Sequence, residues 1–343
     1  MDYHGLLNNR VLSAIRKRDV DKVFKLLLMP NFDLNYTAKK KVTPLILASK
    51  LGLYSVCEKL VSLKVEITCS DNDGRTALQH ASYHGYTNIV ELLINAGSDI
   101  HQVNQEGDQA LHESVTGGNV DTVEVLLSAG SDVNRPNNIT GSTPLDLAVL
   151  HDRTDIVNIL LHAGANVHRR SSAEETALHF AVQVGSTDIV RLLLNAGANI
   201  NSTNILGETP LALAVQEKKI NVVKFLIETG CTSDQSDNLS PFFIACRQNS
   251  QDIICYLLSE GYNLSQNAWL KRYTYLRLEE SNPKLLEYIF YRCENPMTLK
   301  ESCRKRIRQS LRPNLRDKVP LLNLPKALKQ WIIKDFIYDI QSY

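Results

Sequence analysis

Two histidines four residues apart have the spacing in this chain that most resembles a metal site. His80 and His84 would lie on one face of a helix, a separation that zinc ligands can use. No glutamate stands between them as in a His-Glu-x-x-His motif, and no third ligand is evident. We therefore expect both to be structural, with no metal bound. His112 and His179 likewise suit a structural hydrogen bond better than general base catalysis.

Cysteine is the other side chain with reactive potential, and its distribution argues against catalysis. The chain has seven cysteines, an odd number, and no two of them form a Cys-x-x-Cys pair. This favours reduced thiols over a disulfide framework. Cys303 has no histidine within a helical turn to activate it as a nucleophile. Since phosphate-binding loops and nucleophile elbows are also missing from the sequence, we expect a protein that is not an enzyme and uses no cofactor.

Composition narrows the class of protein and its compartment. The chain has 343 residues, of which 43% are hydrophobic and 22% charged, and its formal net charge is +1. The composition is typical of a globular protein, and the small net charge indicates neither nucleic acid nor a membrane as partner. The first residues lack a basic segment followed by an apolar one, and no apolar run is long enough to span a bilayer. We expect a cytoplasmic protein, with the nucleus as a second compartment.

A short motif recurs along most of the chain at a nearly constant interval. In its clearest form the motif reads Thr-Pro-Leu. It starts at Thr43, Thr76, Gln109, Thr143, Thr176, Thr209 and Ser240, in steps of 33, 33, 34, 33, 33 and 31 residues. Self-similarity at a fixed period indicates a repeat architecture in which each unit contacts its neighbours.

Each repeat predicts two short helices and a polar turn. Threonine is a good helix N-cap and proline fits the first helical position, so a helix should begin at each motif, as over 77–83. A second helix has apolar residues at helical spacing, such as Ile89, Val90 and Leu93, and a glycine such as Gly97 closes it. One unit cannot bury its apolar faces alone, so the units should stack. The predicted fold is an all-α solenoid.

These patterns divide the chain into four segments. Residues 1–38 form a helical pair without the motif, which we expect to cap the array. Residues 39–266 hold about seven repeats, 267–295 connecting helices, and 296–343 a separate C-terminal segment.

The repeats resemble a known family. The 33-residue period, the Thr-Ala-Leu-His sequence at 176–179 and the Ala-Gly-Ala-Asn-Ile ending at 196–200 resemble ankyrin repeats. The resemblance covers roughly residues 40 to 265, and it implies paired antiparallel helices with short β-turn loops and a concave face for protein partners. The sequence departs from the family at Glu174, where the turn glycine is missing, and in the shortened copy after Ser240.

The C-terminal segment contains one amphipathic helix pattern. Leu299, Cys303, Ile307 and Leu311 stand four residues apart behind Thr298, which can cap the helix. A segment this short cannot bury so many apolar groups, so the stripe must dock on the array or on a partner. A helix that caps the array would bury Leu299 and Cys303 in the chain's own core, whereas a docking helix would leave them available.

This helix resembles the first half of a SOCS box. That half begins with Ser, Thr or Pro, then Leu, and continues with Cys and an aliphatic residue at intervals of four. Thr298, Leu299, Cys303 and Ile307 match all four positions. In the family this helix binds elongin C, and the resemblance implies the same contact for these residues.

The second half of a SOCS box carries Leu-Pro-aliphatic-Pro, which a cullin, usually cullin-5, recognises. Leu322, Leu324 and Pro325 match this motif, and Asn323 replaces its first proline. The box covers about residues 296 to 340. The whole chain resembles the ankyrin repeat and SOCS box family, and the resemblance implies elongin B/C, cullin-5 and a RING-box protein as partners.

A basic run overlaps the box. Residues 300–318 contain eight Lys or Arg and two acidic residues, which suits a nuclear localisation signal or a nucleic-acid patch. No aromatic residues interleave with the run as stacking platforms. The solvated face of an amphipathic helix is therefore the preferred interpretation.

Two turn tips depart from the polar consensus and are the candidates for substrate specificity. One pairs two arginines with two glutamates where the turn glycine is missing, and the other is apolar. The residues are Arg169, Arg170, Glu174, Glu175, Ile205 and Leu206. Arginine and exposed apolar groups are the usual anchors of interfaces.

Two functions from different classes remain. The leading hypothesis is a non-catalytic substrate receptor of a cullin-RING ubiquitin ligase that holds a target protein on the array and elongin B/C on the box. The alternative is an ankyrin scaffold or inhibitor in signalling with no ligase link. They differ in whether the Leu299 stripe is available to elongin C.

Overall fold

The computed structural model describes residues 3–29, 32–37, 41–231 and 240–260, and in these ranges it contains sixteen α-helices and no strand. Extended pairing there is limited to one bridge between Ser70 and Thr76. The predicted helical solenoid is confirmed. Within the same ranges, no helix combines the length and apolar content needed to cross a membrane. The expected connecting helices (267–295) and SOCS box (296–343) lie outside the described residues.

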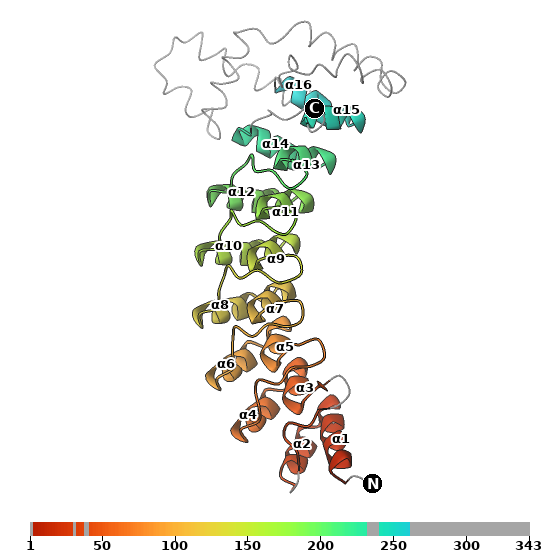
Figure 1. Ribbon diagram of the computed structural model, residues 1–343, viewed down its shortest axis with the longest axis vertical. Helices are drawn as coiled ribbons and strands as arrows, with labels where there is room; N and C mark the ends of the chain where they lie inside the picture. Colours follow the sequence, from red (N-terminus) through yellow and green to blue (C-terminus); the bar gives the residue numbers. More distant parts are fainter. Residues whose placement is uncertain (1–2, 30–31, 38–40, 232–239, 261–343) are drawn as a thin grey trace. The chain divides into compact units, whose positions relative to one another are not determined.

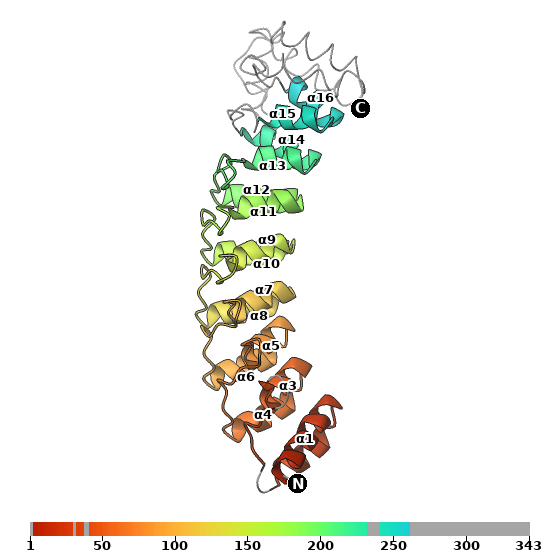
Figure 2. The ribbon, with the colours of Figure 1, turned by 45° about the vertical axis from the view of Figure 1, so that its right-hand side comes forward.

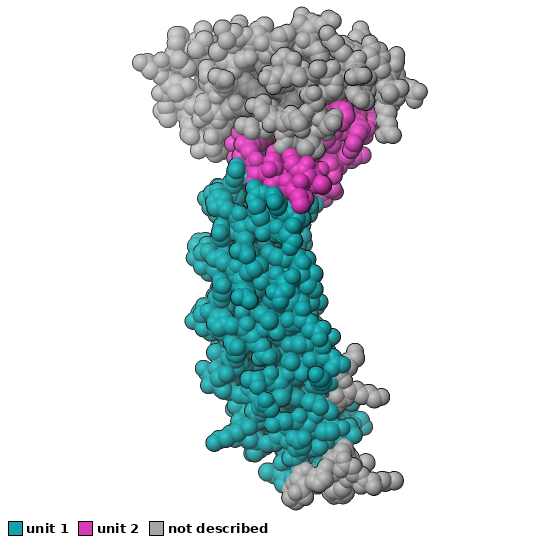
Figure 3. All heavy atoms as spheres, in the orientation of Figure 1, with its two compact units in different colours: residues 1–199 teal, residues 200–343 magenta. Residues whose placement is uncertain are grey.

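The helices belong to two compact units, residues 1–199 and 200–343 (Figure 3). The helices of the first unit are α1 (Tyr3–Arg16), α2 (Val20–Leu27), α3 (Pro44–Leu51), α4 (Tyr54–Ser62), α5 (Ala77–Tyr83), α6 (Thr87–Asn95), α7 (Ala110–Gly117), α8 (Val120–Ser128), α9 (Pro144–Leu150), α10 (Thr154–His162), α11 (Ala177–Val184) and α12 (Thr187–Asn195). Those of the second unit are α13 (Pro210–Gln216), α14 (Ile220–Thr229), α15 (Pro241–Arg247) and α16 (Gln251–Ser259).

The first unit has two rows of helices. Helices α3, α5, α7, α9 and α11 pack side by side in one row, and α4, α6, α8, α10 and α12 pack in the other (Figure 1). The long turns between repeats lie along one side of this stack, and the short connections within repeats lie along the opposite side (Figure 2). In the second unit, α13 packs on α15 and α14 packs on α16.

The recurring threonine begins the first helix of a repeat by capping it. Thr143 Oγ1 accepts a hydrogen bond from the N–H of Asp146 at 3.3 Å, and Asp146 Oδ2 accepts one from the N–H of Thr143 at 2.8 Å. Pro144 follows at the first helical position, where no N–H partner is needed. Two orphan donors are thereby satisfied, which fixes where α9 starts.

His112 and His179 make the structural hydrogen bonds predicted for them. Each ring accepts, at Nδ1, the N–H of the cap residue three positions earlier, at 3.1 Å. His112 Nε2 also donates to the carbonyl oxygen of Arg135 at 2.9 Å, which joins α7 to the following turn. Burial lowers the pKa of His112 to about 4, with the Arg135 hydrogen bond opposing. A neutral ring suits this pair of contacts, because one nitrogen must accept and the other donate.

Apolar side chains between the two rows form the core of the first unit. Leu78, Ile89, Leu93 and Leu111 are all almost completely buried. Burying one such side chain is worth roughly 1.5–3 kcal/mol. Much of this burial is against the neighbouring repeat, so a repeat is stable only inside the array.

Two glycines are required for different reasons. Gly97 closes α6 with a φ of 92° in open space, so only its left-handed backbone favours glycine. Gly117 lies within α7, where a Cβ would collide with the carbonyl oxygen of Tyr83 in α5. The missing side chain at 117 therefore allows α5 and α7 to pack closely.

Candidate partner-binding surface

The turns between repeats of the first unit are linked into one edge by main-chain hydrogen bonds. The donors are the N–H groups of Gln105, Asn138 and Ser172, and the acceptors are the carbonyl oxygens of Asp73, Glu106 and Thr140, at 3.1, 2.9 and 3.0 Å respectively. Each bond joins the tip of one turn to the tip of the next. The tips are thus held at a fixed spacing, and such preorganisation lowers the entropic cost of binding a folded partner.

Each tip is also tied internally by a side chain at its start. Asn104 Oδ1 accepts the N–H groups of residues 106 and 108, both at 2.9 Å. In the second unit Asn204 Oδ1 accepts those of Leu206 at 3.0 Å and Glu208 at 2.9 Å. These side chains close tight turns of the kind that Asn and Asp favour. Side chains at the tips therefore project from a backbone held in place.

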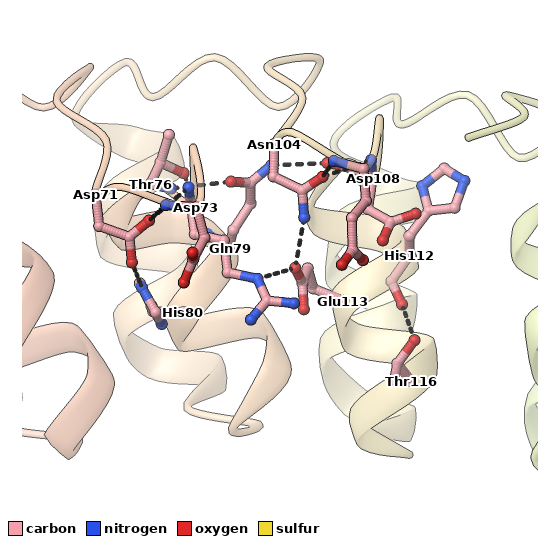
Figure 4. A network of polar contacts seen from close by, with 12 residues as sticks. Asp71, Asp73, Thr76, Gln79, His80, Asn104, Asp108, His112, Glu113 and Thr116 are labelled. Carbon is pink, nitrogen blue, oxygen red and sulfur yellow. Dashed lines mark hydrogen bonds and ion pairs between the residues drawn. The ribbon is translucent and has the colours of Figure 1, made fainter. Parts of the chain in front are cut away.

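A buried polar network lies behind the tips of the repeats that start at Thr76 and Gln109 (Figure 4). Arg75 Nε donates to Glu113 Oε1 at 2.6 Å, and Asn104 Nδ2 donates to the same oxygen at 3.0 Å. Burial raises the pKa of Glu113, with Arg75 opposing. Burial alone would lower the pKa of Arg75, but the Glu113 carboxylate outweighs it and the pKa is raised.

His80 belongs to the same network. Its Nε2 lies 2.8 Å from Asp71 Oδ2, and both side chains are nearly buried (Figure 4). The other Asp71 oxygen accepts the N–H groups of Asp73 at 3.0 Å and Arg75 at 2.9 Å. Burial lowers the pKa of His80, with Asp71 opposing. His80 therefore stabilises the turn that begins at Asp71. In the described ranges, no group of three His, Cys, Asp or Glu side chains could bind a metal ion.

The turn edge of these two repeats is acidic, a feature that sequence reasoning missed. Asp73 and Glu106 are exposed at successive tips. Asp71, Asp108 and Glu113 lie close to them (Figure 4), and Arg75 is hydrogen-bonded to Glu113. Each of these acidic residues, taken alone, is typical of a polar turn. Alignment of the turns on the repeat period is the signal that could have revealed them as one surface.

The predicted specificity tip at 169–175 is built around a strained residue. Glu174 has a φ of 56° and takes the position that glycine holds in the other turns. Arg170 Nη1 donates to the Glu174 carbonyl oxygen at 3.3 Å and lies 3.6 Å from its carboxylate. Glu175 Oε1 instead accepts from Gln183 Nε2 of α11 at 2.8 Å. The structure thus brings Arg170 and Glu174 together, turns Glu175 toward α11, and leaves Arg169 exposed.

The second predicted tip presents apolar side chains to solvent. Ile205 and Leu206 are 65% and 69% exposed, although both are large and apolar. They belong to the second unit and the 169–175 tip to the first. Ile139 is a third exposed apolar tip residue, in the first unit, which sequence reasoning missed. Its signal was the same as that of Ile205, an aliphatic residue inside a polar turn.

The residues predicted to bind elongin C and a cullin lie outside the described residues. They are Thr298, Leu299, Cys303, Ile307, Leu322, Asn323, Leu324 and Pro325. Their assignment stays a prediction.

The described cysteines are poor nucleophiles. Cys57, Cys69, Cys231, Cys246 and Cys255 are all free thiols. Burial raises the pKa of Cys57 to about 11 and that of Cys231 to about 12. Because the thiolate is the reactive form, these two are inert at neutral pH.

Family models match two parts of the chain. The model for ankyrin repeats matches in three copies, at residues 12–104, 89–171 and 178–268. The model for the SOCS box matches residues 295–332. Among curated proteins, none matches the chain.

Solved ankyrin structures resemble the described fold. The ankyrin repeat domain of Bcl-3, a member of the IkappaB family, is 28% identical, with a TM-score of 0.55 over 62% of this chain and 97% of that one. The human ASB11 ankyrin repeat domain is 24% identical, with a TM-score of 0.56 over 63% of this chain and 96% of that one. With ankyrin repeats matched over most of its length and a SOCS box behind them, the chain belongs to the ankyrin repeat and SOCS box family.

Proposed function

We propose that this chain is the non-catalytic substrate-recognition subunit of a cullin-RING ubiquitin ligase. The match to a SOCS box over residues 295–332, C-terminal to the array, is the observation that carries the proposal. The box binds the elongin B/C heterodimer, which connects the chain to cullin-5 and a RING-box protein. The array holds the protein to be ubiquitinated, in the cytoplasm.

Two short groups of residues make the contacts of the box in this proposal. The residues that contact elongin C are Thr298, Leu299, Cys303 and Ile307. Those that contact the cullin are Leu322, Asn323, Leu324 and Pro325. Leu299 and Cys303 are four residues apart, a spacing that would place both on one face of a helix and allow both to enter a single apolar site.

The target is bound along the turn edges of the array. The preorganised tips support this, because their backbones are tied both internally and to one another. In the first unit the contacts come from Arg169, Arg170, Glu174 and Glu175, and in the second from Ile205 and Leu206. Two exposed aliphatic side chains on a fixed turn suit an apolar pocket of a folded target.

The chain contributes proximity to the reaction. A target held on the array has a high effective concentration of lysines near the conjugating enzyme, which the RING protein recruits. Aligned groups can contribute several kcal/mol in this way without any chemistry by the receptor. The bond-making residues belong to other subunits.

Co-purification with elongin B/C tests the proposal. The full chain is co-expressed with both elongins and compared with the double variant Leu299→Ala, Cys303→Asp. We expect the wild type to retain elongin C and the variant to lose it. The variant Ile205→Asp, Leu206→Asp is the control, since it alters the array but not the box. If the wild type failed to retain elongin C, the scaffold or inhibitor function would replace the receptor function.

The choice of cullin is a separate question, because Asn323 stands where the motif has proline. Proline fixes φ near −65° and would preorganise the loop for binding. We expect Asn323→Pro to increase capture of cullin-5 by the receptor–elongin B/C complex. Unchanged capture would mean that Asn323 does not limit the contact.

A further inference from the structure

Aromatic side chains gather at the short connections of two neighbouring repeats in the first unit. Tyr54 begins α4 and is 37% exposed, and Tyr83 ends α5 and is 42% exposed. The His84 ring lies edge-on to Tyr83, with centroids 5.2 Å apart, and 5.9 Å from Tyr86. Tyr86 covers Gly52, where a Cβ would meet its ring. These four aromatic residues form one patch on the edge opposite the turn tips, which we call the aromatic centre.

The same edge is basic on the N-terminal side of the aromatic centre. Lys17 and Arg18 share the α1–α2 connection with Asp19, Asp21 follows in the first turn of α2, and Lys50 lies in the last turn of α3. The three cations are exposed. None of them makes an ion pair within the described ranges. Tyr86 of the aromatic centre packs over Gly52, two residues after Lys50. Burial lowers the pKa of His84, and the charge of Lys50 lowers it further. We call these three cations the basic end.

The edge is acidic on the other side of the aromatic centre. Asp121 lies in the first turn of α8, Asp152 in the α9–α10 connection and Asp155 in the first turn of α10. All three are exposed and have no ion pair in the part of the chain that the structure describes. Arg153 packs its guanidinium group over Gly118. We call the three aspartates the acidic end.

The sequence shows the same separation of charge over a longer range. Residues 10–64 contain twelve Lys or Arg and four Asp or Glu, a net charge of +8. Residues 65–134 contain one Lys or Arg and eleven Asp or Glu, a net charge of −10. The sign changes between Tyr54 and Tyr83, at the aromatic centre.

We propose that this edge is the interface of a two-fold symmetric dimer of the chain. An isologous interface must be complementary to itself. A two-fold axis through Tyr83 and His84 sets the basic end of each copy against the acidic end of the other, so the favourable pairing occurs twice. Lys50 is one repeat before the axis and Asp121 one repeat after it, which makes them direct partners.

The types of residue also suit the two parts of an interface. Tyrosine is enriched among the side chains that contribute most to binding at interface centres. Charges at the rim contribute mainly to encounter rate and register, and salt weakens them. The turn tips lie on the opposite edge (Figure 2), so the dimer leaves the proposed substrate surface open and does not depend on the ligase function.

Sedimentation velocity on the full chain tests the proposal. In about 50 mM salt we expect a species of twice the 38.5 kDa chain mass. Because paired charges flank the aromatic centre, the dimer dissociation constant should rise about tenfold or more in about 500 mM salt. A wild type that stays monomeric at about 100 μM in low salt would overturn the proposal, since most specific homodimers would form at that concentration.

Two charge-reversal variants identify the interface. The first carries Lys17→Glu, Arg18→Glu and Lys50→Glu, and the second carries Asp121→Lys, Asp152→Lys and Asp155→Lys. Each variant alone sets like charges against each other and should be monomeric. Their equimolar mixture should form a heterodimer, because the two changed edges are complementary. Failure of the mixture to associate, or dimers of either variant alone, would contradict the two-fold pairing.

Two further variants separate the interface from folding. Tyr83→Asp should abolish the dimer while circular dichroism stays unchanged, because the side chain is partly exposed. Asp73→Lys with Glu106→Lys reverses charge on the opposite edge and should leave the dimer intact. A dimer that survived Tyr83→Asp would show that its interface lies elsewhere.

Discussion

Arg75 and Glu113 form a 2.6 Å ion pair that crosses from the turn of one repeat to the first helix of the next. The Glu113 side chain is 3% exposed. It stands four residues after the cap residue, a position that Leu147, Phe180 and Leu213 fill in later repeats. At this repeat boundary a charged contact therefore replaces an apolar one.

Arg75→Ala should destabilise the first unit, because it leaves a buried carboxylate unpaired. Breaking a fully buried pair costs about 3–5 kcal/mol, and the partial exposure of Arg75 reduces the expected loss to about 1–3 kcal/mol. Urea denaturation followed by circular dichroism measures it. Adding Glu113→Leu to Arg75→Ala should recover most of the lost free energy of unfolding.

Arg170→Ala is the matched control, because its pair with Glu174 is exposed on both sides. We expect a change within about 0.5 kcal/mol. Equal effects of Arg75→Ala and Arg170→Ala would show that the buried pair contributes nothing beyond a surface contact.

His112 should make stability fall as the pH is lowered. Its pKa is about 4 in the folded chain against an ordinary value of 6.5, so between pH 4 and pH 6.5 the unfolded chain binds a proton that the folded chain does not. The contribution is complete above pH 6.5 and is lost as the pH falls toward 4, by up to roughly 3 kcal/mol. Unfolding free energies between pH 7 and 5 for wild type and His112→Gln measure it.

The comparison with His112→Gln is needed because other buried groups titrate in the opposite sense. Burial raises the pKa values of Glu113 and Asp146, so each of these carboxyl groups favours the folded state as the pH falls. The contributions of Glu113 and Asp146 are present in both the wild type and His112→Gln, so they cancel when the two pH profiles are subtracted. Parallel pH profiles of the two proteins would contradict the assignment to His112.

Gly117→Ala should cost more than Gly97→Ala, although Gly117 is helical and Gly97 is not. Alanine at 97 meets open space and is strained only by a φ of 92°, which costs about 1–2 kcal/mol. Alanine at 117 gains up to about 1 kcal/mol of helix propensity, but its Cβ collides with the Tyr83 carbonyl oxygen and forces α5 and α7 apart. Thermal unfolding of both variants decides the order, and a more stable Gly117→Ala would contradict the close packing.

The fold could be predicted from the sequence because the residues of each repeated motif determine their own local structure. The threonine that begins a motif caps a helix and a short turn ends it, so α5 was predicted at its observed bounds, Ala77–Tyr83. Histidine at the fourth position of the motif predicted the structural roles of His112 and His179. These features depend only on residues that are close in the sequence, so one sequence is enough to predict them.

The surface was harder to predict because its features depend on residues about 33 positions apart. Asp73 and Glu106 form one acidic edge only when the turns stack. Tyr83 and Ile139 are exposed, yet an isolated Tyr or Ile in a sequence suggests burial. At the predicted tip, Glu174 was recognised as a missing glycine, but its contact with Arg170 required coordinates.

Ile205→Asp with Leu206→Asp should remove target binding without destabilising the array. Both side chains are mostly exposed, so unfolding free energy should change by no more than about 0.5 kcal/mol. Recovery of ubiquitinated proteins with the receptor, quantified by mass spectrometry, should lose the target that the wild type retains. The control Leu28→Asp changes another exposed leucine, 72% exposed on α2's C-terminal side, and should retain it. Equal retention by both would remove this tip from the substrate surface.

The affinity of the full chain for elongin B/C is the measurement that tests the receptor function most directly. Isothermal titration of the wild type should give saturable binding at one site. Leu299→Ala should weaken it more than tenfold, because one buried leucine is worth roughly 1.5–3 kcal/mol. The array variant Ile205→Asp, Leu206→Asp should bind like the wild type. No binding by the wild type, or equal affinity of wild type and Leu299→Ala, would contradict the assignment of residues 298–307 as the elongin C contact.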